Sequence, residues 1–124
     1  MRSLKINEQG NPIERTKLYD FDAIKKAKEI METDPSEHLV ISRLADKAGI
    51  NEFKLKIGFK EIFGISPYKY LIKIRLDRAK LLLEETDYTI REIADKVGFG
   101  TYNGFSMCFR NAFGVLPSQY RNSI

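Results

Sequence analysis

The 124 residues, 43% of them hydrophobic and 31% charged, fit a single soluble domain with a modest core and a formal net charge of +4. No apolar run approaches the roughly 20 residues of a membrane span and the N-terminus lacks the apolar stretch of a signal peptide, so we expect a cytoplasmic protein without a membrane partner. One cysteine, Cys108, and one histidine, His38, exclude an internal disulfide and argue against a zinc site, so we expect no metal or other cofactor.

The first segment with a regular apolar pattern follows a polar leader. Residues 1–19 carry turn signals at Gly10, Asn11 and Pro12, which predict a leader or interdomain linker. With Asp20 or Asp22 as its N-cap, a first helix is predicted to end at Asp34 and Pro35. Its apolar residues recur at helical spacing, at Phe21, Ile24, Ala27, Ile30 and Met31.

Two helices are predicted on either side of Gly49. The first runs from about Ile41 to Ala48, and its start is poorly signalled because Val40 stands where a cap is expected. Asn51 can cap the next helix, whose apolar face holds Leu55, Phe59, Ile62 and Phe63. The opposite face of that helix carries Glu52, Phe53, Lys56, Ile57 and Lys60.

The remainder of the chain also reads as helical. Ser66 and Pro67 start a long helix to about Glu85, whose apolar residues occupy more than one stripe and predict a central connector. Thr89 and Glu92 form a capping box for a helix that ends at Gly98. Another helix begins near Gly100 or Thr101, and a short last one near Pro117. The residues of the former expected to face inward are Phe105, Phe109, Ala112 and Phe113. The predicted fold class is all-α, without a convincing strand.

The chain repeats one pattern about fifty residues apart. The offset is 49 before the turn of the repeated unit and 50 after it. Residues 40–124 hold 14 Lys/Arg against 9 Asp/Glu, whereas residues 1–39 hold 7 against 8, so the basic character belongs to the repeats. The first copy is Leu44-Ala45, Ala48-Gly49-Ile50, Phe59-Lys60, Phe63-Gly64, Pro67 and Tyr70, and the second is Ile93-Ala94, Val97-Gly98-Phe99, Phe109-Arg110, Phe113-Gly114, Pro117 and Tyr120.

Each copy has the spacing of a helix-turn-helix unit: a short helix, a glycine-containing turn, and a second helix that can enter a DNA major groove. Two such units on a small basic chain predict binding to double-stranded DNA.

This duplicated pattern resembles the AraC/XylS family of bacterial transcription regulators over about residues 21–122. The resemblance implies a seven-helix domain with two homeodomain-like helix-turn-helix subdomains joined by a long helix. The first would span residues 20–65, the connecting helix 66–86 and the second 87–124. A connector of ~30 Å, at ~1.5 Å per residue, is close to the ~34 Å of one duplex turn. We therefore hypothesise that both recognition helices enter adjacent major-groove segments.

Position in the motif indicates which residues meet DNA. Asn103 is the best candidate to hydrogen-bond an adenine edge, Lys56 can read guanine or meet a phosphate, and Phe53, Ile57 and Met107 can touch thymine methyl groups. Lys54, Lys60 and Arg110 are interpreted as phosphate contacts. The full set of predicted base-facing residues is Glu52, Phe53, Lys56, Ile57, Tyr102, Asn103, Ser106 and Met107.

The chain departs from the family pattern at two positions. Many members have an arginine where this chain has Ile57 and Met107. Without these arginines, recognition of DNA would depend less on bidentate contacts to bases and more on methyl contacts or DNA shape. Other interpretations stay open: the apolar residues can pack against neighbouring helices, the lysines can form a merely solvated face, and Tyr102 and Asn103 can be ordinary cap and surface residues. Gly58, inside the first recognition helix, is expected to cost about 1 kcal/mol relative to alanine.

Two other classes of protein compete with a DNA-binding domain. A protein-interaction module would use the apolar residues to bind a partner such as RNA polymerase and would bind DNA weakly and nonspecifically. An enzyme is disfavoured, since the chain has no nucleophile-base pair, metal cluster or phosphate-binding loop. Family members usually carry a ligand-sensing or dimerisation domain, and the linker-like leader favours a piece of a longer regulator.

Overall fold

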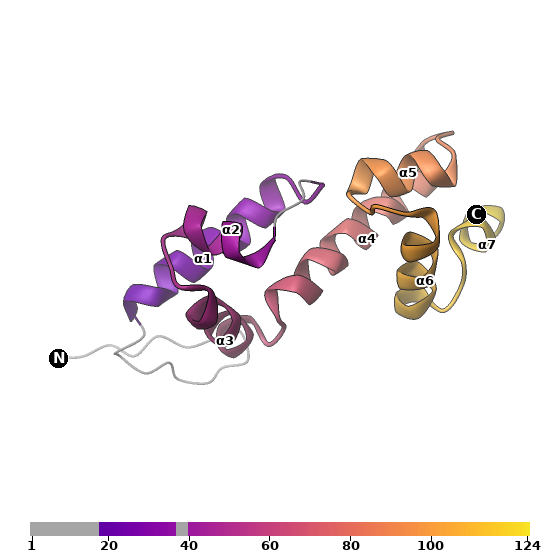
Figure 1. The fold of residues 1–124 in the computed structure, drawn as a ribbon. Coiled ribbons are helices and arrows are strands. Elements are labelled where there is room, and N and C mark those ends of the chain that lie inside the picture. Colours follow the sequence, from indigo (N-terminus) through magenta and orange to yellow (C-terminus); the bar gives the residue numbers. More distant parts are fainter. Residues whose placement is uncertain (1–17, 37–39) are drawn as a thin grey trace. The chain divides into compact units, whose positions relative to one another are not determined.

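The computed structural model describes residues 18–36 and 40–124, and these residues form seven α-helices without a strand (Figure 1). The all-helical prediction is confirmed. The helices are α1 (Leu18–Thr33), α2 (Ile41–Ala48), α3 (Glu52–Phe63), α4 (Pro67–Glu85), α5 (Ile90–Val97), α6 (Tyr102–Phe113) and α7 (Pro117–Asn122). Helix α1 begins at Leu18, so neither Asp20 nor Asp22 is its cap. The predicted leader up to residue 17, and His38, lie outside the described residues.

Side-chain caps set where the recognition helices begin. The Asn51 Oδ1 accepts hydrogen bonds from the backbone N–H groups of Phe53 and Lys54, at 2.8 and 3.2 Å. Thr101 Oγ1 accepts one from Gly104 at 3.0 Å. These oxygens satisfy N–H groups that have no partner within the helix. The predicted cap Asn51 is therefore confirmed, and Thr101 rather than Gly100 caps α6.

Both short first helices end at a glycine in the left-handed conformation. Gly49 follows α2 with φ of 76° and Gly98 follows α5 with φ of 103°. The backbone N–H of Ile50 then bonds the carbonyl of Ala45 at 3.0 Å, and that of Phe99 bonds Ala94 at 2.9 Å. Any side chain would be strained at these two positions, so glycine allows the sharp turn between the two helices of each pair.

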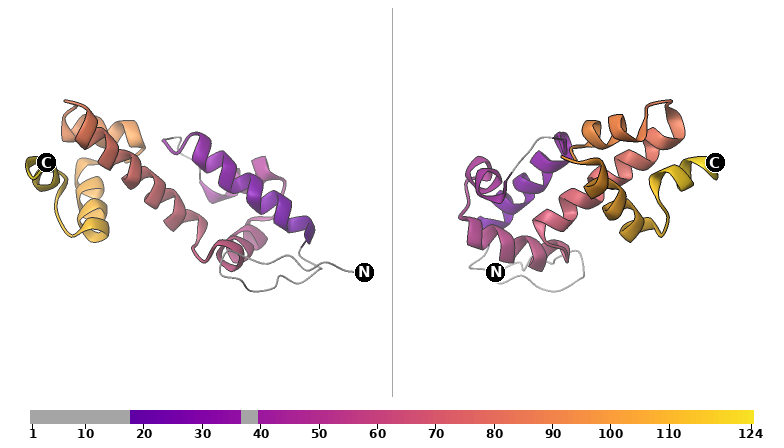
Figure 2. Two further views of the ribbon diagram at one scale, coloured as in Figure 1. Left: turned by 180° about the vertical axis from the view of Figure 1, so that it is seen from behind. Right: turned by 45° about the vertical axis from the view of Figure 1, so that its right-hand side comes forward.

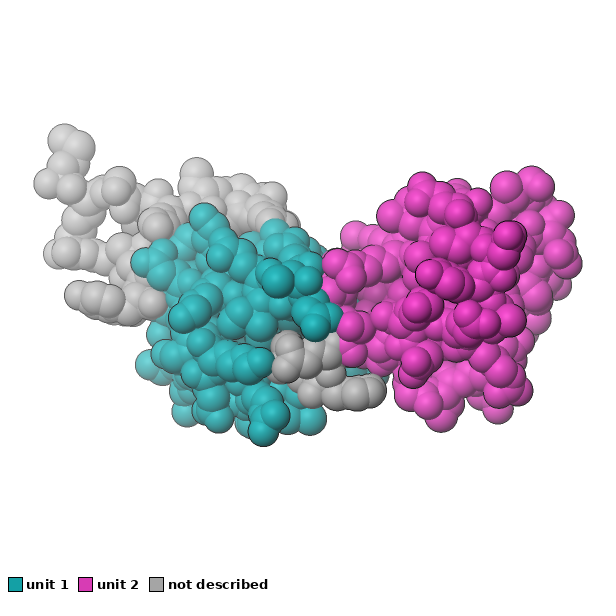
Figure 3. Space-filling view, turned by 90° about the horizontal axis from the view of Figure 1, so that it is seen from above, with its two compact units in different colours: residues 1–34, 39–71 teal, residues 35–38, 72–124 magenta. Residues whose placement is uncertain are grey.

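The chain divides into two compact units (Figure 3). Unit 1 comprises residues 1–34 and 39–71, and unit 2 comprises residues 35–38 and 72–124. Helix α4 therefore contributes its first residues to unit 1 and the rest to unit 2. Each unit contains one helix-turn-helix pair, α2 with α3 and α5 with α6, as the repeat predicts.

The core of unit 1 lies between α1, α2 and α3, which contact one another pairwise (Figure 2). Phe59 and Leu55 of α3 are fully buried, as predicted from their spacing. Gly58 also faces α1, because a Cβ at this position would lie 2.3 Å from the Ile24 Cδ1. The glycine thus lets α1 approach the recognition helix closely. The buried residues that line this core are Ile24, Ala27, Met31, Leu44, Ala45, Ala48, Leu55, Phe59 and Ile62.

The core of unit 2 is built from α4, α5 and α6. Phe105 and Phe109 of α6 are fully buried among Leu76, Ala79, Leu83, Ile93, Ala94 and Val97. Phe113 packs against this cluster, but Ala112 is exposed to solvent, so its predicted inward position is wrong. Phe113 is itself only partly buried, and Ala112, one residue earlier, points about 100° away from it around the helix, outside the packed face.

Each unit contains the same set of side-chain contacts at the end of its own helix-turn-helix pair. We call this set, a tyrosine–glutamate hydrogen bond and a lysine over a phenylalanine ring, the clasp. In unit 1 the Tyr70 hydroxyl donates to Glu32 at 2.7 Å and the Lys28 Nζ lies 4.8 Å from the centre of the Phe63 ring. In unit 2 the Tyr120 hydroxyl donates to Glu84 at 2.7 Å, and the Lys80 Nζ lies 4.7 Å from the centre of the Phe113 ring. The repeat therefore extends to α1 and the second half of α4.

Candidate nucleic-acid interface

Helix α3 presents one fully exposed face opposite its buried one. Phe53 and Ile57 lie one turn apart on this face and are 70% and 49% exposed. Lys54, Lys56 and Lys60 are also exposed, with Glu52 at the start of the helix. The interpretation of Phe53 and Ile57 as packing residues is thus wrong for the described structure. Two exposed apolar side chains one turn apart, beside three lysines, fit a surface that meets a ligand.

Two of these lysines face carboxylates. Lys56 Nζ lies 3.3 Å from Glu52 Oε1, four residues earlier on α3, and Lys54 Nζ lies 4.0 Å from Asp20 Oδ2 on α1. Both lysine side chains are more than half exposed, so each pair contributes little to stability. The Glu52 carboxylate holds the Lys56 ammonium at the start of the recognition helix, where base edges are read in helix-turn-helix proteins.

Helix α6 offers a different surface. Asn103 is exposed and Met107, one turn further, is 55% exposed. Arg110 is exposed near the C-terminal end of the helix. Asn103 and Met107 occupy the same positions as Phe53 and Ile57, fifty residues earlier. The second helix therefore presents an amide where the first presents an aromatic ring.

Two predicted base-facing residues of α6 are placed less simply. Ser106 is only 8% exposed, and its Oγ has no hydrogen-bond partner among the described residues. Tyr102 is half-buried, and the guanidinium carbon of Arg91 on α5 lies 4.9 Å from the centre of its ring. The exposed face of α6 thus contains Asn103 and Met107, while Ser106 faces the protein. Arg91 is not among the residues predicted from the sequence; its only signal there is a basic residue in the first turn of the first helix of the pair.

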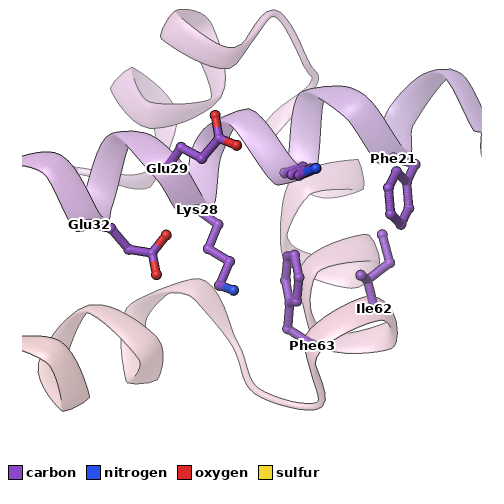
Figure 4. Close-up of a pocket in the computed structure, with 7 residues that line it drawn as sticks. Phe21, Lys28, Glu29, Glu32, Ile62 and Phe63 are labelled. Atoms are coloured by element: carbon purple, nitrogen blue, oxygen red, sulfur yellow. The ribbon is translucent and has the colours of Figure 1, made fainter. Parts of the chain in front are cut away.

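A hollow of about 260 Å³ lies between α1 and α3 of unit 1, and its lining does not include Phe53 or Ile57. Figure 4 shows Lys28 extending from α1 toward Phe63, with Glu32 beside it and Phe21 and Ile62 further along. Lys28, Glu32 and Phe63 already belong to the clasp of unit 1. Their contacts account for these side chains without a ligand.

Neither a metal cluster nor a membrane helix is found in the described part of the chain. No three His, Cys, Asp or Glu residues there are grouped to hold an ion. Among the same residues, no helix is long and apolar enough to cross a membrane.

The arrangement of α2 with α3, and of α5 with α6, defines a tandem helix-turn-helix protein. Residues 44–123 match the family described as helix-turn-helix domain. An AraC-like transcription regulator of Streptomyces lividans is 33% identical over 88 residues, which are 71% of this chain and 29% of that protein. The chain spans about a third of the length of the curated relatives it matches.

Two solved structures share the fold and most of the sequence length. An AraC-type transcriptional regulator from Chromobacterium violaceum has a TM-score of 0.75 and 30% identity, covering 85% of this chain and 94% of that one. The DNA-binding domain of AdpA, a global transcriptional factor solved with a target DNA, has a TM-score of 0.79 and 26% identity over 82% of this chain and 92% of that one.

The chain therefore belongs to the AraC-type helix-turn-helix family, and it is a domain with which such transcription regulators bind double-stranded DNA.

Proposed function

We propose that α3 and α6 enter adjacent major-groove segments of an asymmetric promoter site and read it with different chemistry. The exposed face of α3, with Phe53 and Ile57 between lysines, carries this proposal. In it, α3 contacts thymine methyl groups and α6 hydrogen-bonds a base edge through Asn103. The residues proposed to face bases are Glu52, Phe53, Lys56, Ile57, Asn103 and Met107, and those proposed to meet phosphates are Lys54, Lys60 and Arg110.

Selection of sites from a random duplex library at about 150 mM salt, followed by sequencing, tests the geometry. Two short motifs centred about 10 base pairs apart are expected if both units read DNA in successive turns. One motif alone would mean that the other unit only holds phosphates, which contradicts the proposal for that unit. No enrichment would favour the interaction module instead.

The roles of base and phosphate residues are separable by substitution. Asn103→Ala should relax the preference at one base position of the selected site, because the amide supplies a bidentate contact. Lys60→Ala should weaken all duplexes alike and reduce the slope of log K against log salt by about 1, because one phosphate contact is lost. Affinity titrations at several salt concentrations check both. Equal behaviour of the two variants would refute the assignment.

Thymine methyl contacts by Phe53 and Ile57 are testable with DNA alone. Replacing thymine by uracil in the half-site of α3 removes only the methyl group. Each contacted methyl should contribute about 0.8 kcal/mol, so affinity should fall about four-fold per position. At the position that Phe53 contacts, Phe53→Ala should bind the thymine and uracil duplexes equally, whereas a position contacted by Ile57 should still distinguish them. If the variant still distinguishes thymine from uracil as the parent does, Phe53 does not contact the methyl group.

The competing function is a protein-interaction module that uses the same exposed apolar residues. Its affinity for duplex DNA would be weak and independent of sequence. A specific site found by selection would favour the DNA-binding function over the interaction module. A slope of log K against log salt of about −0.9 per neutralised phosphate is expected in addition.

We further propose that this domain acts in the bacterial cytoplasm within a longer regulator that contains a ligand-sensing or dimerisation domain and contacts RNA polymerase. The greater length of the relatives supports the additional domain. Reconstitution of transcription from a promoter with the selected site, using purified RNA polymerase, tests the contact; unchanged transcription on addition of the protein would contradict it.

A further inference from the structure

Arg91 and Tyr102 join the two helices of the second helix-turn-helix pair. Arg91 lies in the first turn of α5, and Tyr102 is the first residue of α6. The guanidinium carbon lies 4.9 Å from the centre of the tyrosine ring, within the distance of a cation–π interaction. The contact therefore ties the N-terminal end of α5 to the N-terminal end of the recognition helix.

The position of this contact corresponds to the DNA backbone in a helix-turn-helix complex. There the first helix crosses the phosphate backbone, and the N-terminal residues of the second helix reach base edges. Arg91 is exposed, and no hydrogen bond or ion pair joins it to any other described residue. Its five N–H donors remain available for an anion, and the planar guanidinium suits a phosphate.

The first unit has nothing comparable at these positions. Ser42 stands 49 residues before Arg91, and Glu52 stands 50 residues before Tyr102. Glu52 carries a negative charge and pairs with Lys56. The contact is thus a property of unit 2, which has only Arg110 as a charged residue on its recognition helix.

We propose that Arg91 binds a DNA phosphate and that Tyr102 positions it, which makes Tyr102 a support for a phosphate contact and not a reader of bases. The proposal rests on the proposed entry of α6 into the major groove. It gives the second unit a contact with the DNA backbone in addition to that of Arg110, and it fixes the depth at which Asn103 meets the bases.

Salt-dependent binding of four variants to the selected duplex and to an unrelated duplex of equal length tests this proposal. Arg91→Ala should weaken both duplexes and make the salt slope less steep by about 0.9. Tyr102→Phe keeps the ring and should bind like the parent, whereas Tyr102→Leu should lose about two- to five-fold on both duplexes. Lys96→Ala is the matched control, because Lys96 is another α5 cation over an aromatic ring, 4.6 Å from that of Tyr88.

The double variant Arg91→Ala/Tyr102→Leu should bind as Arg91→Ala alone does, since the ring acts only through the arginine. An unchanged slope for Arg91→Ala, an equal slope change for Lys96→Ala, or additive losses in the double variant would overturn the proposal. A change of base preference in the Tyr102→Phe variant would mean that Tyr102 reads bases, which contradicts the proposal. If the parent protein shows no salt-dependent binding to either duplex, the proposed function itself fails, and this outcome is distinct from the others.

Discussion

The Tyr120 hydroxyl on α7 donates one hydrogen bond to Glu84, near the C-terminal end of α4. This bond raises the pKa of Tyr120 above its ordinary value of 10.0, and partial loss of water and the negative charge of Glu84 add to the rise. The neutral hydroxyl is the form that donates. Its contribution to stability is therefore complete below pH 10 and is lost as the pH rises through the raised pKa.

Tyr120→Phe removes this donor and should lower the urea midpoint of unfolding near pH 8. The difference from the parent should shrink above about pH 10, because the parent then loses the same hydrogen bond by ionisation. Urea titrations from about pH 7 to about pH 11.5 measure it. Tyr68→Phe is the control, since Tyr68 is 62% exposed. A constant difference across this range would contradict the role of the hydroxyl.

Gly58 shows how a residue that is unfavourable in a helix can allow a neighbouring side chain to pack closely. Alanine would improve helix propensity by about 1 kcal/mol. Its Cβ, however, would lie 2.3 Å from Cδ1 of Ile24, a residue only 1% exposed. The equivalent position in α6 holds Cys108, which packs against the core of unit 2. The cost expected from the sequence is thus offset by close helix packing.

Helix α2 is the one element of the two helix-turn-helix pairs that begins without a side-chain cap. Val40 has φ of −72° and ψ of 151°, close to the −65° and 160° of Thr89 at the start of α5. The Thr89 hydroxyl accepts the Glu92 N–H at 3.1 Å, whereas Val40 offers no acceptor. The poor start signal in the sequence therefore reflects a real gap in hydrogen bonding.

Val40→Thr should stabilise unit 1 by about 1 kcal/mol, because threonine has the shape of valine and adds the oxygen that accepts a free N–H of the first turn. Val40 is 63% exposed, so no packing is lost. Denaturant unfolding measures the change. Val115→Thr, an exposed valine outside any N-cap, is the matched control and should change little. Equal effects of the two substitutions would show that capping is not the cause.

At the scale of the whole molecule, each compact unit carries its own aromatic core. Phe59 in unit 1 and Phe109 in unit 2 stand fifty residues apart in the repeat and are both fully buried. Phe63 and Tyr70 surround the first ring, and Phe105, Phe113 and Tyr120 the second. Two separate cores on one chain allow the units to differ in stability.

Phe59→Ala and Phe109→Ala are expected to destabilise their own units by about 3 to 5 kcal/mol, because each leaves a cavity in a closed core. Amide hydrogen exchange followed by mass spectrometry should show protection lost in α1–α3 for the first variant and in α5–α7 for the second. Loss of protection throughout the chain in either variant would mean that the units unfold as one.

The sequence alone determined the seven helices, the duplicated helix-turn-helix pairs and the DNA-binding class, because helix caps, glycine turns and apolar spacing are local signals. The end of α2 and the cap of α3 follow from the single residues Gly49 and Asn51. Only α1 began earlier than its acidic residues indicated.

Only the tertiary structure decided which side chains remain at the surface. Helical spacing puts Ser106 and Ala112 near the boundary between faces, and packing against neighbouring helices buries the first and exposes the second. Packing likewise leaves Phe53 and Ile57 exposed and brings Arg91 to Tyr102, eleven residues away. Such contacts depend on how two helices cross, and neither helix alone contains that information.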